Sequence, residues 1–275
     1  MHVRCKRVGI VGLLLSHSVV AGWFNQQTPL TKAHESILQG DMPSFWQTMH
    51  DVWNNETLEQ SENWFNLLPV MYQRQCGRDL PNKLPLWLES LDIRIIQRDE
   101  PLRRYYRWEI EGYTKQYINY VEIKGKNVQL KLDNQVRQQK QSFYGESEEQ
   151  VKSIDGGVYQ ITVTTTAKAH WKGTILLAPL HNIQWITWQG NNWQLTEGVN
   201  SNKESLMCPP QEIKAVMMKP ASYEVVWHHR ANVNKRYSLP ELQPGPYWYS
   251  VSLINHRFQG NIHLEIQHRI LKRFN

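Results

Sequence analysis

Histidine is the residue type with the clearest capacity for metal chemistry in this chain, and its densest group lies in the C-terminal third. The adjacent pair His228 and His229 is followed by His256, His263 and His268. Neutral imidazole binds Zn²⁺ well, but all the ligands must face the same ion. Adjacent strand residues point to opposite faces, so the pair cannot share an ion, and His263 alternates out of phase with its apolar neighbours. The spacing predicts solvated or hydrogen-bonded histidines without a metal or other cofactor, and it leaves open a ligand set assembled in three dimensions from separated histidines.

Other catalytic patterns are missing from the sequence. Glycoside hydrolysis needs two carboxylates about 5–10 Å apart, and no spacing among the 25 Asp and Glu residues selects such a pair. The chain has neither a Gly-x-Ser-x-Gly turn for a serine nucleophile nor a glycine-rich phosphate loop. The sequence therefore predicts a protein that is not an enzyme, and it names no catalytic residue.

Three tryptophans surround a short polar turn between residues 185 and 193. Trp185, Trp188 and Trp193 flank a Gly-Asn-Asn turn in which Asn191 and Asn192 supply amide groups. Aromatic faces beside amides suit the binding of a sugar ring, which makes this segment the candidate ligand-binding site. The alternative is a β-hairpin whose cross-strand aromatic pairs stabilise the sheet. An exposed, coplanar pair of indoles would favour the glycan hypothesis.

The first 22 residues have the pattern of a secretory signal peptide. A basic segment at residues 4–7 precedes an apolar run over residues 8–20, and Ala21 occupies the last position before a cleavage point. The run is shorter than the roughly 20 apolar residues that cross a bilayer, which disfavours the alternative of an uncleaved anchor. The sequence predicts a signal peptide at 1–21 and a protein that lies outside the cytoplasm without a stable membrane span.

Removal of this segment changes the charge on which partner predictions depend. The full chain has 31 Lys and Arg against 25 Asp and Glu, a formal charge of +6. The segment contains three basic residues and no acidic one, so the remainder has 28 basic residues and a charge of +3. Nucleic acid is not expected as a partner, because binding it needs a concentrated cationic face. The segment 103–108 alternates arginines with aromatics, which is typical of a half-buried strand.

Cysteine usage changes in the same way. Cys5 lies in the predicted signal, which leaves Cys76 and Cys208 in a compartment where disulfides persist. A bridge between them would close 132 residues, which chain-entropy arithmetic credits with an upper figure of about 4–5 kcal/mol. Two free buried thiols and a reactive thiol pair are the alternatives, but a reactive pair would want Cys-x-x-Cys spacing. The sequence favours a structural disulfide.

The segment after the signal has helical spacing. Gly40 suits the end of one helix, and Asp41 suits the N-cap of the next. A capping box predicts a third helix from Thr57. These features define a helical module at 22–91. Apolar residues recur at steps of three and four in the second helix and predict one buried stripe, formed by Met42, Phe45, Trp46, Met49, Val52 and Trp53.

From Asp92 onward the apolar period changes from 3.6 to 2, as in short strands bounded by turns. This region contains an internal repeat. Residues 157–163 and the following Trp-x-Gly-x-Ile match residues 245–251 and the following Phe-x-Gly-x-Ile. We expect each copy to form the final hairpin of a sandwich, with Tyr159 or Tyr247 in a tyrosine corner. The predicted fold is therefore α+β and multidomain, with two tandem Ig-like antiparallel β-sandwiches at 92–181 and 182–275 after the helical module.

Short motifs spread over the chain carry a family resemblance. They are the segment WFNQQTPL at 23–30, the pairs Cys76-Gly77 and Cys208-Pro209, and the terminal Phe258-Gln259-Gly260. With these motifs the chain resembles an uncharacterised, domain-of-unknown-function family of exported gamma-proteobacterial proteins. The resemblance implies a periplasmic protein similar to the accessory product encoded beside a two-component histidine kinase and regulator that respond to cell-envelope stress. It implies no catalytic residues.

Three hypotheses about function follow. The leading one is a non-enzymatic periplasmic accessory protein that binds another protein of the cell envelope, with the periplasmic domain of a sensor kinase as the expected partner. The alternative is a glycan- or peptidoglycan-binding protein that uses the hairpin between Trp185 and Trp193. The third is an envelope hydrolase, which would be recognised by buried carboxylates that converge in a cleft.

Overall fold

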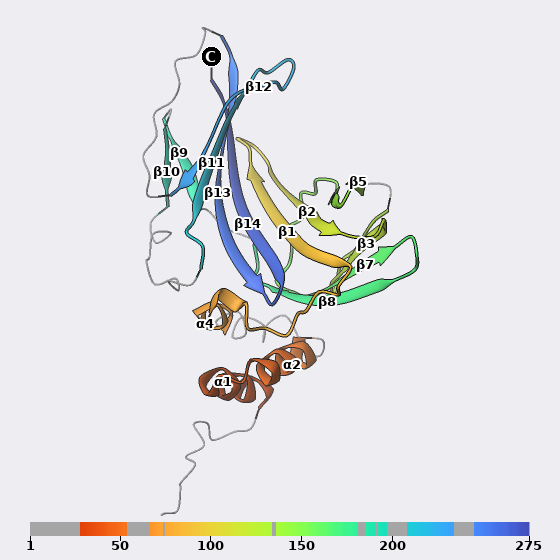
Figure 1. The fold of residues 1–275 in the computed structure, drawn as a ribbon. Coiled ribbons are helices and arrows are strands. Elements are labelled where there is room, and N and C mark those ends of the chain that lie inside the picture. Colours follow the sequence, from red (N-terminus) through yellow and green to blue (C-terminus); the bar gives the residue numbers. More distant parts are fainter. Residues whose placement is uncertain are drawn as a thin grey trace, which may run out of the picture.

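The computed structural model describes residues 28–53, 67–73, 75–133, 136–180, 185–190, 192–196, 208–233 and 245–274. These residues form a mostly β fold with a few helices and several sheets (Figure 1), which agrees with the predicted α+β class. The predicted signal peptide at 1–21, its cleavage after Ala21 and the helix predicted from Thr57 lie outside the described residues. No helix among the described residues is both long and apolar enough to cross a membrane.

The helices are short and lie together at one end of the molecule (Figure 1). They are α1 (Pro29–Gln39), α2 (Met42–Trp53), α4 (Leu67–Gln73) and the 3-10 turn η2 (Gln75–Gly77). As predicted, Gly40 ends α1 with a positive φ of 77°, and the Asp41 carboxylate caps α2 by accepting from the Ser44 backbone N–H at 3.1 Å. The predicted stripe of α2 is buried at four positions, which are Met42, Phe45, Trp46 and Met49.

The strands form three sheets among the described residues. Sheet A has eight strands in the order β12-β11-β13-β14-β1-β2-β6-β5, sheet B has the order β4-β3-β7-β8, and sheet C is the hairpin β10-β9. Their bounds are β1 (Leu88–Asp99), β2 (Arg104–Thr114), β3 (Ile118–Lys124), β4 (Gln129–Leu132), β5 (Arg137–Gln139), β6 (Ser142–Glu146), β7 (Gly157–Thr165), β8 (His170–Leu177), β9 (Ile186–Gln189), β10 (Asn192–Leu195), β11 (Glu212–Met218), β12 (Val225–Asn232), β13 (Tyr247–Gln259) and β14 (Ile262–Phe274).

Sheet A corrects the prediction of two tandem sandwiches. Its first strand, β1, pairs in parallel with its last, β14, from Leu91 opposite Ile262 to Asp99 opposite Ile270. Strands from both predicted ranges therefore share one sheet, and the boundary at 181/182 does not separate two sheets. β1 also begins inside the range predicted as the helical module. Alternation within each strand predicts which residues face the core, but it carries no information about which distant strand is the neighbour.

One face of sheet A is apolar and is covered in two places. Strands of sheet B cover the part formed by β1, β2 and β14, and the β9–β10 hairpin covers the part formed by β11 and β13. Helices α1, α2 and α4 pack against the other face of sheet B, where Leu176 and Val158 point toward them. The opposite face of sheet A carries the polar side chains of the same strands, as the alternation of buried core residues requires.

The predicted repeat has equivalent structure in its first half only. β7 and β8 form a hairpin, and the Tyr159 hydroxyl donates to the carbonyl of Asp155 at 2.7 Å, as in a tyrosine corner. In the second copy, β13 continues to Gln259, and the chain turns at Gly260 and Asn261. The Phe-x-Gly-x-Ile motif therefore spans a hairpin turn, whereas Trp-x-Gly-x-Ile lies within β8.

Gln259 joins the helices to both large sheets. Its side chain is fully buried at the end of β13. Its amide nitrogen donates to the Leu176 carbonyl of β8 and to the Tyr72 hydroxyl of α4, both at 2.7 Å. Its amide oxygen accepts from the Leu176 N–H at 2.8 Å. Burial raises the pKa of Tyr72 to about 12, so the hydroxyl stays neutral.

The β13–β14 turn packs against the segment that follows η2. The N–H of Gly260 donates to the Gly77 carbonyl at 2.9 Å, and that of Asn261 donates to the Asn82 carbonyl at 2.8 Å. The Asn82 side chain in turn donates to the Thr174 carbonyl of sheet B at 2.6 Å. Gly260 has a φ of 66°, and a Cβ at this position would overlap the Asn82 backbone. Glycine is required here for both conformation and space.

Candidate functional site

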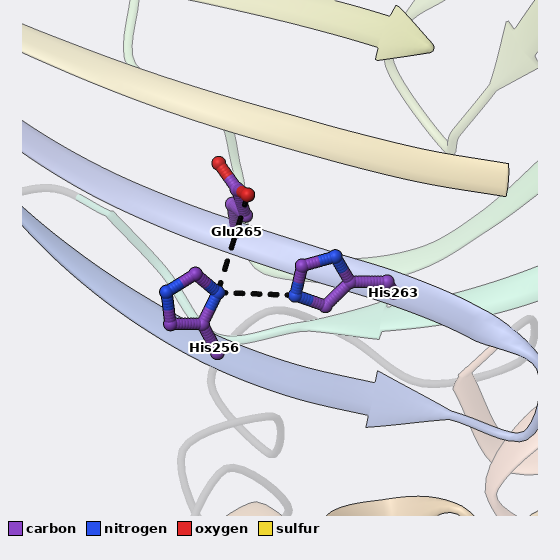
Figure 2. Close-up of side chains that lie close together, drawn as sticks. All are labelled: His256, His263 and Glu265. Carbon is purple, nitrogen blue, oxygen red and sulfur yellow. Dashed lines mark hydrogen bonds and ion pairs between the residues drawn. The ribbon is translucent and has the colours of Figure 1, made fainter. Parts of the chain in front are cut away.

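Two histidines and a glutamate come together on the polar face of sheet A (Figure 2). The β13–β14 register places His256 opposite Glu265, and His263 lies two residues away on the same face of β14. His256 Nδ1 lies 3.1 Å from His263 Nε2 and 4.0 Å from Glu265 Oε1. The three possible ligand atoms all lie within 4.8 Å of one another. We call these three residues the His–Glu cluster.

Side chains of β1 and β14 hold His263 and Glu265 in place. Asp92 of β1 lies beside His263, and its Oδ1 is 2.6 Å from His263 Nδ1. Arg94 and Gln267 each donate to Glu265 Oε2 at 3.0 Å. Glu265 Oε1 is therefore the oxygen directed toward His256. A carboxylate on the outer nitrogen of one histidine and donors on the outer oxygen of the glutamate are the supporting contacts seen around protein-bound metals.

His256 is the most buried of the three, with its side chain 6% exposed. Burial lowers its pKa, and the nearby His263 and Arg230 lower it further against the opposing effect of Glu265 and Glu212. Its Nε2 atom is buried, makes no hydrogen bond, and lies 3.8 Å from Glu212 Oε2. The ring is therefore neutral at neutral pH, which is the form in which imidazole binds metals.

The prediction that the adjacent histidines cannot share an ion is confirmed by the register of β12. His228 and His229 lie opposite Val216 and Ala215 on β11, so they point to opposite faces. His268 is fully buried on the apolar face. Its Nδ1 accepts from the N–H groups of Trp185 and Ile186 at 3.0 and 3.3 Å. His268 is therefore a structural residue that is hydrogen-bonded to the backbone at the start of β9.

His268 also determines the protonation of a carboxylate. With Nδ1 accepting, its Nε2 donates to Asp99 Oδ2 at 3.1 Å, and Arg104 donates to both oxygens of Asp99 at 2.7 and 2.9 Å. Burial opposes ionisation of Asp99, but the hydrogen bonds from His268 and Arg104 outweigh it and lower its pKa to about 2. Asp99 is thus a fixed negative charge where the end of β1 meets β14.

The tryptophan hairpin forms, but its indoles lie against the core. β9 and β10 pair with Trp188 directly opposite Trp193, and both pack with Trp185 as partly buried residues on the apolar cluster of β11 and β13. Trp188 lies 5.5 Å from the Tyr249 ring and 6.2 Å from the Phe274 ring, between centroids. Asn192 is exposed at the turn, and Asn191 lies outside the described residues. This arrangement favours the packing alternative, and glycan binding stays a prediction.

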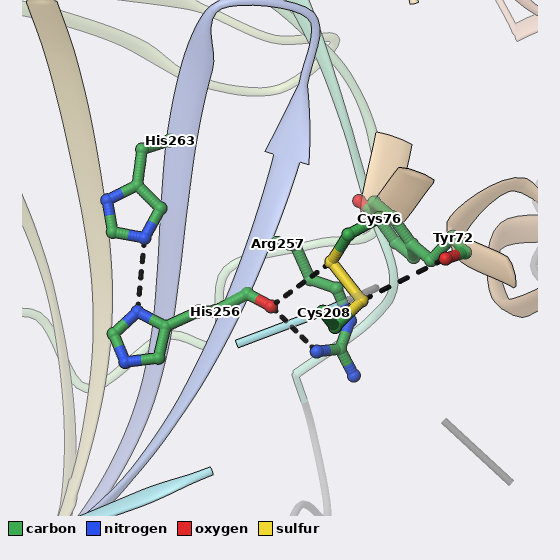
Figure 3. The surroundings of a disulfide bond; sticks show 6 residues. All are labelled: Tyr72, Cys76, Cys208, His256, Arg257 and His263. Carbon is green, nitrogen blue, oxygen red and sulfur yellow. Dashed lines mark hydrogen bonds between the residues drawn. A yellow bond between two sulfur atoms is a disulfide. The ribbon is translucent and has the colours of Figure 1, made fainter. Parts of the chain in front are cut away.

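The predicted disulfide is present and lies next to the His–Glu cluster (Figure 3). Cys76 and Cys208 are joined with a Cα–Cα distance of 4.9 Å. Cys76 Sγ lies 3.7 Å from the backbone carbonyl oxygen of His256, which also accepts from Arg257 at 2.7 Å. The bridge therefore joins η2 covalently to the segment before β11, and it lies against the backbone of β13 at the residue that contributes the buried imidazole.

A second candidate is the free edge of sheet A. β12 is its last strand on one side, and among the described residues no strand pairs with its outer edge. It has eight residues, and at its start Tyr223 is 69% and Val225 52% exposed. The strand at the opposite edge, β5, has only three residues. Long unprotected edges are where sheets accept another strand, whereas short ones are protected from it.

The comparisons with known proteins identify the family. The family described as Protein of unknown function (DUF2861) matches residues 23–275. The chain belongs to this family. The match confirms the resemblance to an uncharacterised family, and it begins two residues after the end of the predicted signal peptide. No curated protein matches the chain.

The His–Glu cluster is a possible ligand set of the kind that the sequence left open, assembled in three dimensions from separated residues. The face argument holds for His228 and His229, but His263 lies out of phase with the core because it shares the polar face with Glu265. The sequence carried a usable signal. Gly-Asn at 260–261 is a two-residue hairpin turn, and a turn there places His256 opposite Glu265. The prediction instead began the second strand at Phe258, which hid the pairing.

Proposed function

We propose that this protein is a non-enzymatic binding protein of the gamma-proteobacterial cell envelope that acts through contact with another protein. The observation that carries the proposal is the eight-residue edge strand β12, which offers backbone hydrogen-bonding groups along the side of sheet A. An extended segment of a partner adds to such an edge by β-augmentation, in which the main chain supplies affinity and alternate side chains supply specificity.

Periplasmic location follows from the signal peptide predicted at 1–21 and is supported by the disulfide. A structural bridge between Cys76 and Cys208 persists in an oxidising compartment and not in the cytosol. The resemblance to accessory proteins of envelope-stress systems makes the periplasmic domain of a sensor histidine kinase the partner we propose. Nucleic acid is not a partner in this proposal.

Site-specific photocrosslinking in cells tests the partner. A crosslinking amino acid is placed at the exposed positions His228 and Arg230 of β12, and, as a matched control, at the exposed Gln129 and Lys131 of β4, the edge of sheet B. We expect a discrete adduct with one envelope protein from β12 and none from β4. Absence of an adduct from β12, or equal adducts from both edges, contradicts the proposal.

Intact-mass measurement of the protein from the periplasmic fraction tests export independently. The expected mass is that of a chain beginning at Gly22, with two hydrogens fewer than its reduced form. A chain that begins at Met1, or one recovered only from the cytoplasm, contradicts the periplasmic assignment.

A further inference from the structure

We infer that the His–Glu cluster is a Zn²⁺ site, in which His256 Nδ1, His263 Nε2 and Glu265 Oε1 are the ligands. Two imidazoles and one carboxylate are a ligand set used by zinc sites that keep a fourth position open. The inference is independent of the proposed partner, because it rests on side chains of β13 and β14 rather than on the edge strand.

The distances suit this ion. Two nitrogens bound to tetrahedral zinc at about 2.0–2.1 Å lie about 3.3–3.4 Å apart, and the two facing nitrogens of His256 and His263 lie 3.1 Å apart. Glu265 Oε1 lies 4.0 Å from His256 Nδ1, so the carboxylate must move inward by about 0.6 Å to reach tetrahedral separation. The two rings are now nearly parallel, at 12°, and must turn about their Cβ–Cγ bonds to face a common point.

The proton arrangement also suits an ion between the two rings. His263 Nδ1 donates to Asp92, so His263 Nε2 accepts the proton of His256 Nδ1, and His256 Nε2 carries a lone pair with no hydrogen-bond donor. When the ion replaces the shared proton, that proton moves to His256 Nε2, which faces Glu212 Oε2 at 3.8 Å. The buried nitrogen that lacked a partner then faces a carboxylate.

The carboxylates around the two rings outnumber the arginines, which favours a cation. Three carboxylates lie beside the two rings: Glu265, Asp92 and Glu212. Two arginines accompany them, because Arg94 donates to the outer oxygen of Glu265 and Arg230 donates to Glu212. Calcium and magnesium prefer all-oxygen sites, so two nitrogen ligands favour zinc over these ions.

Calorimetric titration of ZnCl₂ into the untagged, disulfide-intact mature protein tests the inference. We expect one ion per chain, with visible d–d absorption when Co²⁺ is used instead. His256→Gln and His263→Gln should each weaken binding by more than the roughly 10–100-fold that loss of a supporting contact costs, and Asp92→Asn should fall within that range. His228→Gln, which changes an exposed histidine of β12, is the matched control and should bind as the unmodified protein does.

Thermal unfolding without metal establishes that each variant folds, and the zinc-dependent rise in Tm gives a second readout. That rise should be present in the unmodified protein and in His228→Gln and absent in His263→Gln. Absence of zinc binding overturns the inference, as does zinc binding that survives both cluster histidine substitutions unchanged. Equal binding of Ca²⁺ or Mg²⁺ overturns the assignment to zinc.

Discussion

Replacement of Gln259 by leucine should be among the most destabilising single changes in this protein. The change keeps the side-chain volume similar but removes three hydrogen bonds at a site that is fully buried. It leaves the N–H and carbonyl of Leu176 and the hydroxyl of Tyr72 without that partner. A buried polar group left unsatisfied costs about 1–3 kcal/mol. Relaxation of the surrounding structure will recover part of the cost of the three unsatisfied groups. We therefore expect a loss of about 3–5 kcal/mol in the free energy of unfolding.

Gln138 provides a matched control, because its side chain also makes three hydrogen bonds. Its amide oxygen accepts from the Ile118 N–H at 2.9 Å, and its nitrogen donates to two backbone carbonyls at 3.2 Å. It is only half-buried, so water can replace the lost partners, and Gln138→Leu should cost less than about 1.5 kcal/mol. Urea unfolding monitored by tryptophan fluorescence, with the disulfide intact, gives both values from the midpoint and slope. Equal losses in the two variants would refute the reasoning.

Three further predictions concern the bridge, the charge at the end of β1 and the β13–β14 turn. Serine in place of both Cys76 and Cys208 should lower the free energy of unfolding by up to about 4–5 kcal/mol, and an unchanged urea midpoint would contradict this. Because the pKa of Asp99 is lowered from 3.8 to about 2, ionised Asp99 stabilises the folded protein fully above about pH 4, and this contribution is lost as the pH falls toward 2. After allowance for solvent screening, the free energy of unfolding should fall by about 1–2 kcal/mol over this range. Asp99→Asn should abolish this part of the pH dependence of the free energy of unfolding. If the variant keeps the same pH dependence as the unmodified protein, Asp99 is not its source. Gly260→Ala should lower the free energy of unfolding by about 3 kcal/mol or more. Gly190→Ala is the control, because Gly190 has a φ of 57° with open space around it, and it should cost only about 1–2 kcal/mol. Similar losses of stability in thermal unfolding of the two variants would show that crowding at Gly260 is unimportant.

Structural features that depend on a few neighbouring residues could be predicted from the sequence. The end of α1 at Gly40 and the cap of α2 at Asp41 follow from backbone requirements within one turn of helix. The strand through Trp108 follows from the alternation of arginines with aromatics, and Tyr106 and Trp108 are buried. The disulfide could be predicted because only two cysteines remain after the predicted signal, which left one possible pair.

The arrangement of distant strands could not be predicted in this way. The parallel pairing of β1 with β14 joins segments about 170 residues apart, and the decisive contribution is burial of both strands under sheet B rather than any local pattern. The same pairing brings Asp92 beside His263 and Arg94 beside Glu265. The supporting contacts of the His–Glu cluster therefore exist only once sheet A has formed.

The sequence by itself determined the helix ends, the strand periodicity, the cysteine pair and the expectation of an exported protein, because each depends on near neighbours or on composition. Tertiary structure decided that one sheet joins both halves of the chain and that Trp185, Trp188 and Trp193 pack against the apolar cluster of β11 and β13. It also decided that His256 and His263 meet Glu265. The physical reason is that alternation assigns a side chain to a face of its strand, whereas register and strand order, which are set by burial of the whole sheet, decide which residues share that face.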